Sequence, residues 1–484
     1  MTAGATPVAP VPAGWRVVLD PGVRRLDGGT VLIGGSPLRL LRLSPGGAAL
    51  VARLAAGDPV PAAPAAHRLV RSLLAAGLAH PRPLAPPPPG PGVAVVVPTH
   101  DRAGALAATL AGVVTWRGAG TTPVEVVVVD DASADAAGTA RAAALAGATL
   151  LRHAANRGPA AARNTGWRAT TAELVAFVDA DCEPEPGWLE PLVAHLDDST
   201  VALAAPRIAA LPTPSAPRWL AAYDAHRSPL DLGPTEAAIR PRSRVPYVPG
   251  TALLVRRAAL EAAGGFDEAL RVGEDVDLVW RLVAAGWSAR YDPGAVVGHP
   301  VRSNACAWLG QRFDYGSSAA PLAARHGRTV APLVESRCSL AAWALAGLGL
   351  PGPAAALAMS SAVALGVQVR GRGRHPRTAH PWREAGRIAG GGTLRAGAGV
   401  AHAVRRAWWP LVVPAAALSR RGRRAAALVL LAPPLLEWLA DRPAGLGPLR
   451  WTALRLADDA AYGAGVWVGA GRHRSIAALR PDLR

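Results

Sequence analysis

The apolar and polar positions of this chain follow different patterns along its length. From Val93 to about residue 300, short runs of β-branched residues alternate with segments of helical periodicity. Such alternation predicts an α/β domain with a mostly parallel, Rossmann-like sheet and helices on both faces. Ligands of such sheets bind beyond the carboxyl ends of the strands. The predicted strands lie at 93–100, 124–131, 148–153, 174–181 and 201–208, and the predicted helices at 102–116, 158–170 and 187–197.

The segment before this alternation has the pattern of a small α+β domain. Two strand-like stretches, "RVVLD" and "TVLIGG", precede two apolar helical runs at 47–56 and 65–78. We expect a domain over residues 14–83, close to the lower size limit for an independent core. The proline-rich stretch "LAPPPPGPG" at 84–92 predicts a stiff, extended linker.

The rest of the chain predicts one long loop and a hydrophobic helical region. Residues 211–247 are rich in Pro, Arg and Ser and predict a mobile loop within a sheet domain that spans 93–330. In the region 331–484, the run from Cys338 to Val369 contains no charged residue over 32 positions. A bilayer span needs roughly 20 apolar residues, so this run is long enough to cross a bilayer, but the "LPGP" break favours a helical hairpin or a kinked element. Membrane association and burial of these helices against the catalytic domain are both open alternatives.

The charge and cysteine content of the chain indicate which kinds of molecule it can bind. All 52 basic residues are arginines, against 34 acidic residues, and the net charge of +18 should attract anionic partners. A basic nucleic-acid-binding protein is therefore one alternative, although it leaves the acidic motifs of the sheet domain unexplained. The three cysteines are far apart and form no CxxC, which argues against a disulfide framework or a zinc knuckle. The first residues have no basic segment followed by an apolar one, so we expect no secretory signal and a cytoplasmic catalytic part.

Asp130 and Asp131 end a fully apolar predicted strand, where an unpaired buried carboxylate would cost several kcal/mol. One interpretation is a helix N-cap to which Ser133 contributes. The other is hydrogen bonding to the base or ribose of a nucleotide. The spacing leaves both open.

The stretch "NRGPAAARNTGWR" at 156–168 begins a predicted helix with Gly158 and Pro159. A helix N-terminus together with Arg157 and Arg163 predicts an anion-binding site. The sequence contains no GxxxxGK[ST] motif, and no GxGxxG follows the first strand, which disfavours P-loop and NAD-binding proteins.

Asp179 and Asp181 follow the apolar strand "LVAFV". Side chains at positions i and i+2 of a strand point the same way, so both carboxylates can face one divalent ion. Mg²⁺ and Mn²⁺ prefer oxygen ligands and often share them with substrate phosphates, and such an ion would neutralise a departing diphosphate. The alternative is a polar strand end without a metal.

Glu274 and Asp275 begin a predicted helix in "GEDVDLVWRL". Negative charge at a helix N-terminus is favourable in itself. The alternative is a general base that accepts the proton of an acceptor hydroxyl. His299, at the end of "AVVGHP", is a lone histidine of the kind that is usually structural, and it is of interest only as a third metal ligand.

Five motifs occur in a fixed order between Val93 and Pro300: "VVVPTHDR", "VVVVDDAS", "NRGPAAARNTG", "FVDADCEP" and "GGFDEAL…GEDVDLVWRL". Together they resemble the GT-A nucleotide-sugar glycosyltransferases of the inverting family 2. The resemblance implies a GT-A fold and metal-dependent transfer of a hexose from a nucleotide-sugar. For the donor, it implies nucleoside binding by Thr99, Asp101, Asp130 and Asp131, and contact of Arg163 with the nucleobase or diphosphate.

The same resemblance assigns the catalytic centre. It implies that Asp181, helped by Asp179, binds Mn²⁺ or Mg²⁺, with His299 at the position of a metal-binding histidine. It implies that Asp275 is the base and that Glu274 supports it.

The flanking regions narrow these expectations. Residues 14–83 are similar to the small, winged-helix-like PqqD-type domains that hold precursor peptides in ribosomal-peptide modification systems. With the core and the C-terminal region, they imply transfer of glucose from UDP-glucose, in β-1,4-linked units, to a peptide-derived redox cofactor at the cytoplasmic face of the cell membrane. The same-class alternative is a cell-envelope glycosyltransferase, such as a rhamnosyltransferase with dTDP-rhamnose and a lipid-linked acceptor. The resemblance implies no nucleic-acid partner.

Overall fold

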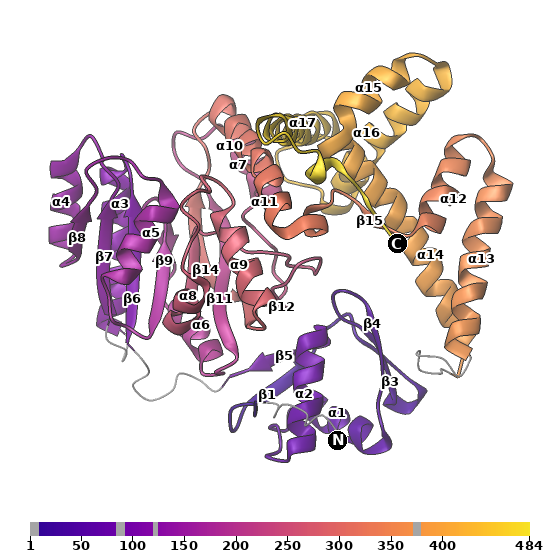
Figure 1. Cartoon of the computed structure of the whole chain (residues 1–484), viewed down its shortest axis with the longest axis horizontal. Helices are drawn as coiled ribbons and strands as arrows, with labels where there is room; N and C mark the ends of the chain where they lie inside the picture. The colour runs from indigo at the N-terminus through magenta and orange to yellow at the C-terminus, as the bar shows by residue number, and fades with distance from the viewer. Residues whose placement is uncertain (1–8, 84–91, 120–123, 371–378) are drawn as a thin grey trace. The chain divides into compact units, whose positions relative to one another are not determined.

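The chain folds into two compact units (Figure 1). The computed structural model describes residues 9–83, 92–119, 124–370 and 379–484. The first unit comprises Met1–Pro212 and Arg227–Pro300, and the second comprises Thr213–His226 and Val301–Arg484. The division after Pro300 therefore precedes the predicted domain boundary at residue 330, and the predicted linker at 84–92 lies, except for Gly92, outside the described residues.

The N-terminal part of the first unit is a small α+β arrangement. Its elements are β1 (Arg16–Leu19), β2 (Arg24–Leu26), η1 (Asp27–Gly29), β3 (Val31–Gly34), β4 (Arg39–Arg42), α1 (Pro45–Ala55), α2 (Pro64–Ala76) and β5 (Ala79–Arg82). β1 pairs with β5, and β2, β3 and β4 form a separate antiparallel sheet. The predicted helical runs coincide with α1 and α2, because their apolar residues recur at helical spacing and are buried, among them Val51, Leu54, Val70 and Leu73.

Arginine–carboxylate pairs join this N-terminal part to the sheet of the same unit. Arg71 donates to both carboxylate oxygens of Asp198, with Nη2 and Oδ1 2.9 Å apart. Arg244 donates to Asp20 at 2.9 Å, and His80 lies 2.9 Å from the same carboxylate. Asp20 and Asp198 are buried, so the loss of a partner would leave an uncompensated charge. These pairs connect the N-terminal part and the sheet within one unit.

A nine-stranded sheet forms the centre of the first unit. Its strands are β6 (Val93–Thr99), β7 (Val124–Asp130), β8 (Thr149–Arg152), β9 (Leu174–Val178), β10 (Glu183–Pro184), β11 (Val201–Leu211), β12 (Ala237–Ala238), β13 (Ala252–Arg256) and β14 (Ser288–Pro300). Their order is β10-β14-β11-β13-β9-β6-β7-β8, with β12 paired to β14. β8, β7, β6 and β9 are mutually parallel, as are β11 and β14, whereas β13 is antiparallel to both β9 and β11. The prediction of a mostly parallel sheet is confirmed, with β13 antiparallel in its middle and the two-residue strands β10 and β12 antiparallel to β14.

The helices of this unit connect and cover the strands. They are α3 (Ala103–Ala119), α4 (Ala136–Leu145), α5 (Pro159–Arg168), α6 (Leu189–Leu196), α8 (Arg257–Ala263) and α9 (Glu274–Ala284). Every residue of β6 and β9 is buried, as expected for strands covered on both faces. α5 lies unusually close to the sheet at Gly166, where a Cβ atom would be 2.2 Å from Cγ1 of Val96. This close packing fixes α5, which carries Arg163, against the central strands.

The segment predicted as a long loop at 211–247 contains regular structure. α7 (Arg218–Arg227) and β12 lie within it, and Ile239 forms a bridge with Val245. The loop prediction is therefore wrong for these elements. The buried Tyr223 of α7 packs against the rings of Trp308 and Trp451, which lie far along the chain, so the local sequence pattern of α7 does not show this contact.

The second unit is helical. Its elements are α7, α10 (Ala305–Ser317), α11 (Ala319–His326), η2 (Gly327–Val330), β15 (Val334–Glu335), α12 (Arg337–Gly347), α13 (Pro351–Arg370), α14 (Pro381–Ala403), η3 (Val404–Trp408), α15 (Trp409–Ala417), α16 (Arg420–Asp441), α17 (Pro448–Arg472), η4 (Ala477–Leu479) and β16 (Asp482–Leu483). The uncharged run at 338–369 folds into α12 and α13, which pack side by side (Figure 1), so the predicted hairpin is confirmed. None of the helices in the described ranges combines the length and apolarity needed to cross a membrane.

Close helix packing explains why the chain from Val301 onward belongs to the second unit. A Cβ atom on Gly316 of α10 would lie 2.0 Å from the carbonyl oxygen of Tyr462 on α17. Arg312 of α10 donates to Asp224 of α7 at 2.8 Å and lies 3.4 Å from Asp458 of α17. Buried charges of this kind are stable only as pairs, so they hold these three helices together.

Candidate active site

Arg163 connects the segments that carry the predicted catalytic residues. The side chain lies on α5, is buried, and donates from Nη2 to Oδ1 of Asp179 and from Nη1 to Oε1 of Glu274, both at 2.7 Å. It also donates to the carbonyl oxygen of Gly250 at 3.3 Å. Asp179 follows β9, Glu274 is the first residue of α9, and Gly250 precedes β13. One guanidinium therefore brings a strand end, a helix start and a loop to one place.

Negative charge is concentrated around this guanidinium. Burial raises the pKa of Glu274 to about 7; the charge of Asp275 acts in the same direction and Arg163 opposes it. Burial also raises the pKa of Asp179 to about 6, with Arg163 opposing the shift and Asp181 adding to it. Carboxylates that raise each other's pKa in this way make a site that a cation stabilises.

Asp275 is positioned by backbone donors. Its Oδ2 accepts a hydrogen bond from the Gly250 N–H at 2.6 Å, and its Oδ1 accepts one from the Val276 N–H at 2.7 Å. A Cβ atom at Gly250 would lie 3.2 Å from both Cζ of Arg163 and Cβ of Asp275, so a larger residue there would have to displace one of these side chains slightly. The half-buried Asp275 carboxylate is thus oriented by its neighbours in the manner expected of a general base.

Asp179 and Asp181 fit the role of metal ligands. The side chain of Asp179 is 29% exposed and that of Asp181 is 19% exposed, and Nε of Arg102 lies 3.9 Å from Oδ2 of Asp181. Mg²⁺ and Mn²⁺ are commonly held by one or two carboxylates together with substrate phosphate oxygens, so these two oxygen donors suffice.

His299 is on β14, where its neighbour Gly298 pairs with Glu183, two residues after Asp181. Within the part of the chain that the structure describes, no three His, Cys, Asp or Glu side chains are grouped as a metal site. The structure therefore does not group His299 with Asp179 and Asp181, and its role as a ligand stays a prediction.

Asp131 is held in a network of donors at the end of β7. It accepts hydrogen bonds from the N–H groups of Arg157 at 2.9 Å and Gly158 at 2.7 Å, and His153 lies 2.7 Å away. Burial disfavours its charge, but these hydrogen bonds outweigh burial and lower the pKa of Asp131. In this structure the carboxylate fixes the turn that leads into α5.

Thr99, Asp101 and Asp130 lie together where β6 and β7 end. Thr99 and Asp130 are paired across the two strands, and Ser133 donates from its N–H to Asp130 at 2.8 Å while its hydroxyl accepts from the Asp101 N–H at 2.9 Å. Among the residues that the structure describes, none is a hydrogen-bond partner of the buried Thr99 hydroxyl, so this hydroxyl is free to bond to a ligand. The N-cap of α4 is Asp135, whose carboxylate accepts from the Gly138 N–H at 2.8 Å. The N-cap interpretation of Asp130 and Asp131 is therefore wrong.

Asn164 is a structural residue of the site that the sequence did not reveal. Its Nδ2 donates to the carbonyl oxygen of Phe266 at 2.8 Å and to Glu268 at 2.9 Å, and its Oδ1 accepts from the Phe266 N–H at 3.0 Å. It fastens the loop before α9 to α5. A buried asparagine in a helix interior, where the residue type is unfavourable, is the signal that could have identified it.

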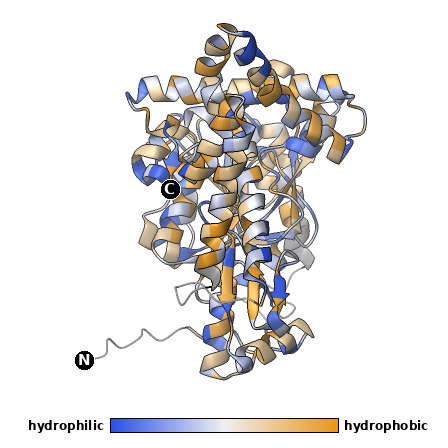
Figure 2. Ribbon diagram, turned by 90° about the vertical axis from the view of Figure 1, so that its right-hand side faces the viewer, coloured by the Kyte–Doolittle hydropathy of each residue, from blue (hydrophilic) through white to orange (hydrophobic). Residues whose placement is uncertain are grey.

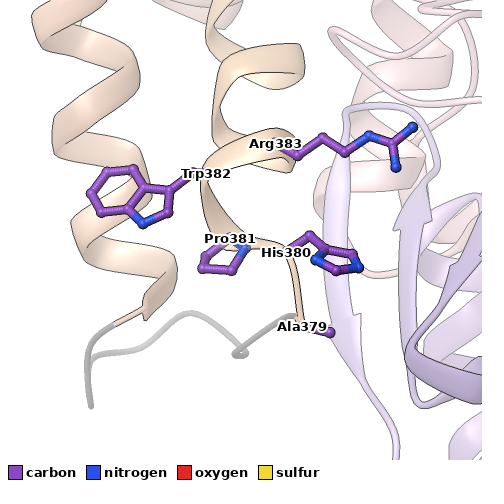
Figure 3. Close-up of a pocket in the computed structure, with 5 residues that line it drawn as sticks. All are labelled: Ala379, His380, Pro381, Trp382 and Arg383. Carbon is purple, nitrogen blue, oxygen red and sulfur yellow. The ribbon is translucent and has the colours of Figure 1, made fainter.

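A surface pocket of about 330 Å³ lies in the second unit and is lined by residues 379–383 (Figure 3). Figure 3 shows Trp382 pointing toward the neighbouring helix and His380 pointing the other way. The Trp382 ring packs on Gly366 of α13, where a Cβ atom would lie 2.4 Å from it. The described residues that line this pocket include no carboxylate, so they are not the groups predicted for the nucleotide-sugar site.

The relatives and the solved structure described next are glycosyltransferases. Residues 94–264 match glycosyl transferase family 2. The chain is 41% identical over 491 residues to the "Pre-mycofactocin glycosyltransferase" of Mycobacterium tuberculosis, covering 98% of this chain and 99% of that relative. It is 31% identical over 193 residues to human "Polypeptide N-acetylgalactosaminyltransferase 15", covering 36% of this chain and 30% of that protein. Among solved structures, a mannosyltransferase from Pyrobaculum calidifontis is 23% identical, with a TM-score of 0.39, covering 65% of this chain and 88% of that one.

Proposed function

Because the chain belongs to family 2 of the glycosyltransferases and has their GT-A fold, we propose that it transfers glucose from UDP-glucose to mycofactocin or its precursor, with inversion, and forms a β-1,4-linked oligomer. The observation that carries this proposal is the 41% identity to the M. tuberculosis relative over 98% of this chain. That match includes the N-terminal part. A cell-envelope rhamnosyltransferase with a lipid-linked acceptor would not require such a part. The peptide-derived acceptor would be held by residues 14–83.

The proposed reaction is a single displacement. A hydroxyl oxygen of the acceptor attacks the anomeric carbon, the bond from that carbon to the β-phosphate oxygen breaks, and UDP leaves. Asp275 accepts the hydroxyl proton during the attack, held in place by the Gly250 N–H at 2.6 Å. Arg163 and Glu274 are positioning residues. Arg163 contacts Glu274 at the start of α9 and Asp179 after β9, both at 2.7 Å, and so holds these two segments together. Attack from the face opposite to the departing diphosphate gives the inverted anomer.

Asp181, with Asp179, would hold Mn²⁺ or Mg²⁺. When bound, the ion would neutralise negative charge on the diphosphate. Thr99, Asp101 and Asp130 would contact the nucleoside, because the orphaned Thr99 hydroxyl and the carboxylates lie at the adjacent ends of β6 and β7.

Asp181→Ala is expected to abolish Mn²⁺-dependent UDP binding, because it removes the main proposed oxygen ligand. Calorimetric titration of UDP into wild-type protein should show binding that strengthens at least about tenfold when Mn²⁺ is added, and the variant should show no such strengthening. Asp135→Asn is the matched control, since asparagine caps a helix as well as aspartate does and the residue lies outside the site. Equal Mn²⁺ dependence in Asp181→Ala and Asp135→Asn would rule out the metal assignment.

A further inference from the structure

Large exposed apolar side chains gather in one unit of the molecule. Among the described residues, 22 such side chains are exposed, and all but Leu38 and Leu145 lie in the second unit. Soluble proteins rarely expose contiguous apolar surface without a partner for it. Figure 2 shows apolar residues interspersed with hydrophilic ones along the helices of this unit.

α16 carries more of these side chains than any other helix among the described residues. Leu428, Leu431, Leu435 and Leu439 recur at helical spacing and are 67%, 42%, 36% and 51% exposed. The same spacing extended toward the start of the helix reaches Arg424 and Arg421, both exposed. At 100° per residue these six positions form one stripe along the helix, with two arginines leading into four leucines. We call this stripe the α16 face.

The preceding helix adds to this surface. α15 packs on α16 and exposes Leu411 and Val413, and Leu418 in the connecting turn is 87% exposed. Arg420 and Arg423 are also exposed, so four arginines lie between two groups of exposed leucines. Apolar side chains next to arginines are the composition of helices that lie in the plane of a membrane interface.

We propose that the α16 face binds the surface of an anionic bilayer, with its leucines at the headgroup boundary and its arginines against lipid phosphates. Charge complementarity selects this partner: the start of α16 carries four exposed arginines, Arg420, Arg421, Arg423 and Arg424, whereas its two carboxylates, Glu437 and Asp441, lie near its other end. A second copy of this chain would bring a second arginine-rich face against the first, whereas an anionic surface neutralises it. This proposal does not depend on which sugar or acceptor the enzyme uses.

The direct test is vesicle flotation with the full-length chain. We expect at least about tenfold tighter binding to vesicles of phosphatidylcholine with phosphatidylglycerol than to vesicles of phosphatidylcholine alone, with a loss of binding at high salt. Leu428→Gln/Leu435→Gln and Arg421→Gln/Arg424→Gln should each weaken binding by at least about tenfold, because each pair of substitutions removes one of the two contributions. α4 offers matched controls in the exposed residues Arg141 and Leu145, and Arg141→Gln/Leu145→Gln should bind as wild type does.

Three results would overturn the proposal. They are absence of flotation with either vesicle, equal binding to both vesicle types, and a dimer in sedimentation experiments that Leu428→Gln/Leu435→Gln dissociates. Release of UDP from UDP-glucose, measured for every variant, reports whether the catalytic unit is folded. Because the substituted side chains are exposed, intact UDP release with lost flotation supports the bilayer surface. Failure of UDP release in the wild type would instead count against the proposed function.

Discussion

Asp275→Asn is expected to lower the turnover number about 10²–10⁴-fold, the range by which a general base accelerates such a step. Asparagine has nearly the same shape and can still accept one of the two backbone hydrogen bonds, from Gly250 or Val276. It cannot take up the proton of the acceptor hydroxyl. The Kd for UDP, measured by calorimetry, should therefore change by no more than about twofold.

The matched control for this variant is Asp135→Asn, which makes the same chemical change at the N-cap of α4 and should keep wild-type turnover. The two variants should differ in initial rates at saturating donor and acceptor. Near-normal turnover of Asp275→Asn would show that another group accepts the proton.

Arg163→Met is expected to lower the free energy of unfolding by about 3–5 kcal/mol, because it leaves Asp179 and Glu274 without their shared buried cation. Arg163→Lys should restore little of this, since a single ammonium cannot reproduce two directed hydrogen bonds to separate carboxylates. Denaturant unfolding followed by circular dichroism measures the effect. Arg168→Met, an exposed arginine on the same helix, should change the free energy by less than about 1 kcal/mol.

The double variant Arg163→Met/Glu274→Gln separates the loss of a charge pair from a general loss of packing. Removing one of the orphaned carboxylates should recover part of the stability that Arg163→Met loses. If the double variant is as unstable as the sum of the two single variants, Arg163 does not act by neutralising Glu274.

Much of this architecture follows from the sequence because strand periodicity and chain direction constrain it. The valine-rich runs and intervening helices predict a parallel sheet, and parallel strands end at one edge, so Asp130 and Asp179 were expected at that edge. The order of the five motifs predicts a family 2 glycosyltransferase, and with the flanking regions a mycofactocin-system one. The full-length relative confirms that resemblance. The family assignment also accounts for the acidic motifs of the sheet domain, which the alternative of a basic nucleic-acid-binding protein leaves unexplained.

The rest depends on contacts between residues far apart in the chain. The position of Arg163 predicted an anion-binding arginine, whereas the structure pairs it with two carboxylates, one of them 111 residues away. α7 escaped prediction because its buried Tyr223 has its partner, Asp458, 235 residues further along the chain. The domain boundary was placed too late for the same reason, since only the packing of α10 on α17 shows that α10 belongs with the C-terminal helices.

The most direct test of the proposed function is to incubate the full-length chain with UDP-glucose, Mn²⁺ and the peptide-derived mycofactocin precursor, and to analyse the product by mass spectrometry and NMR. We expect a product heavier by one or more hexose residues, with β-configured anomeric carbons, formed by the wild type and not by Asp275→Asn. A product with α-configured anomeric carbons, or an unmodified precursor under conditions where UDP-glucose is consumed by transfer to a lipid acceptor, would contradict it.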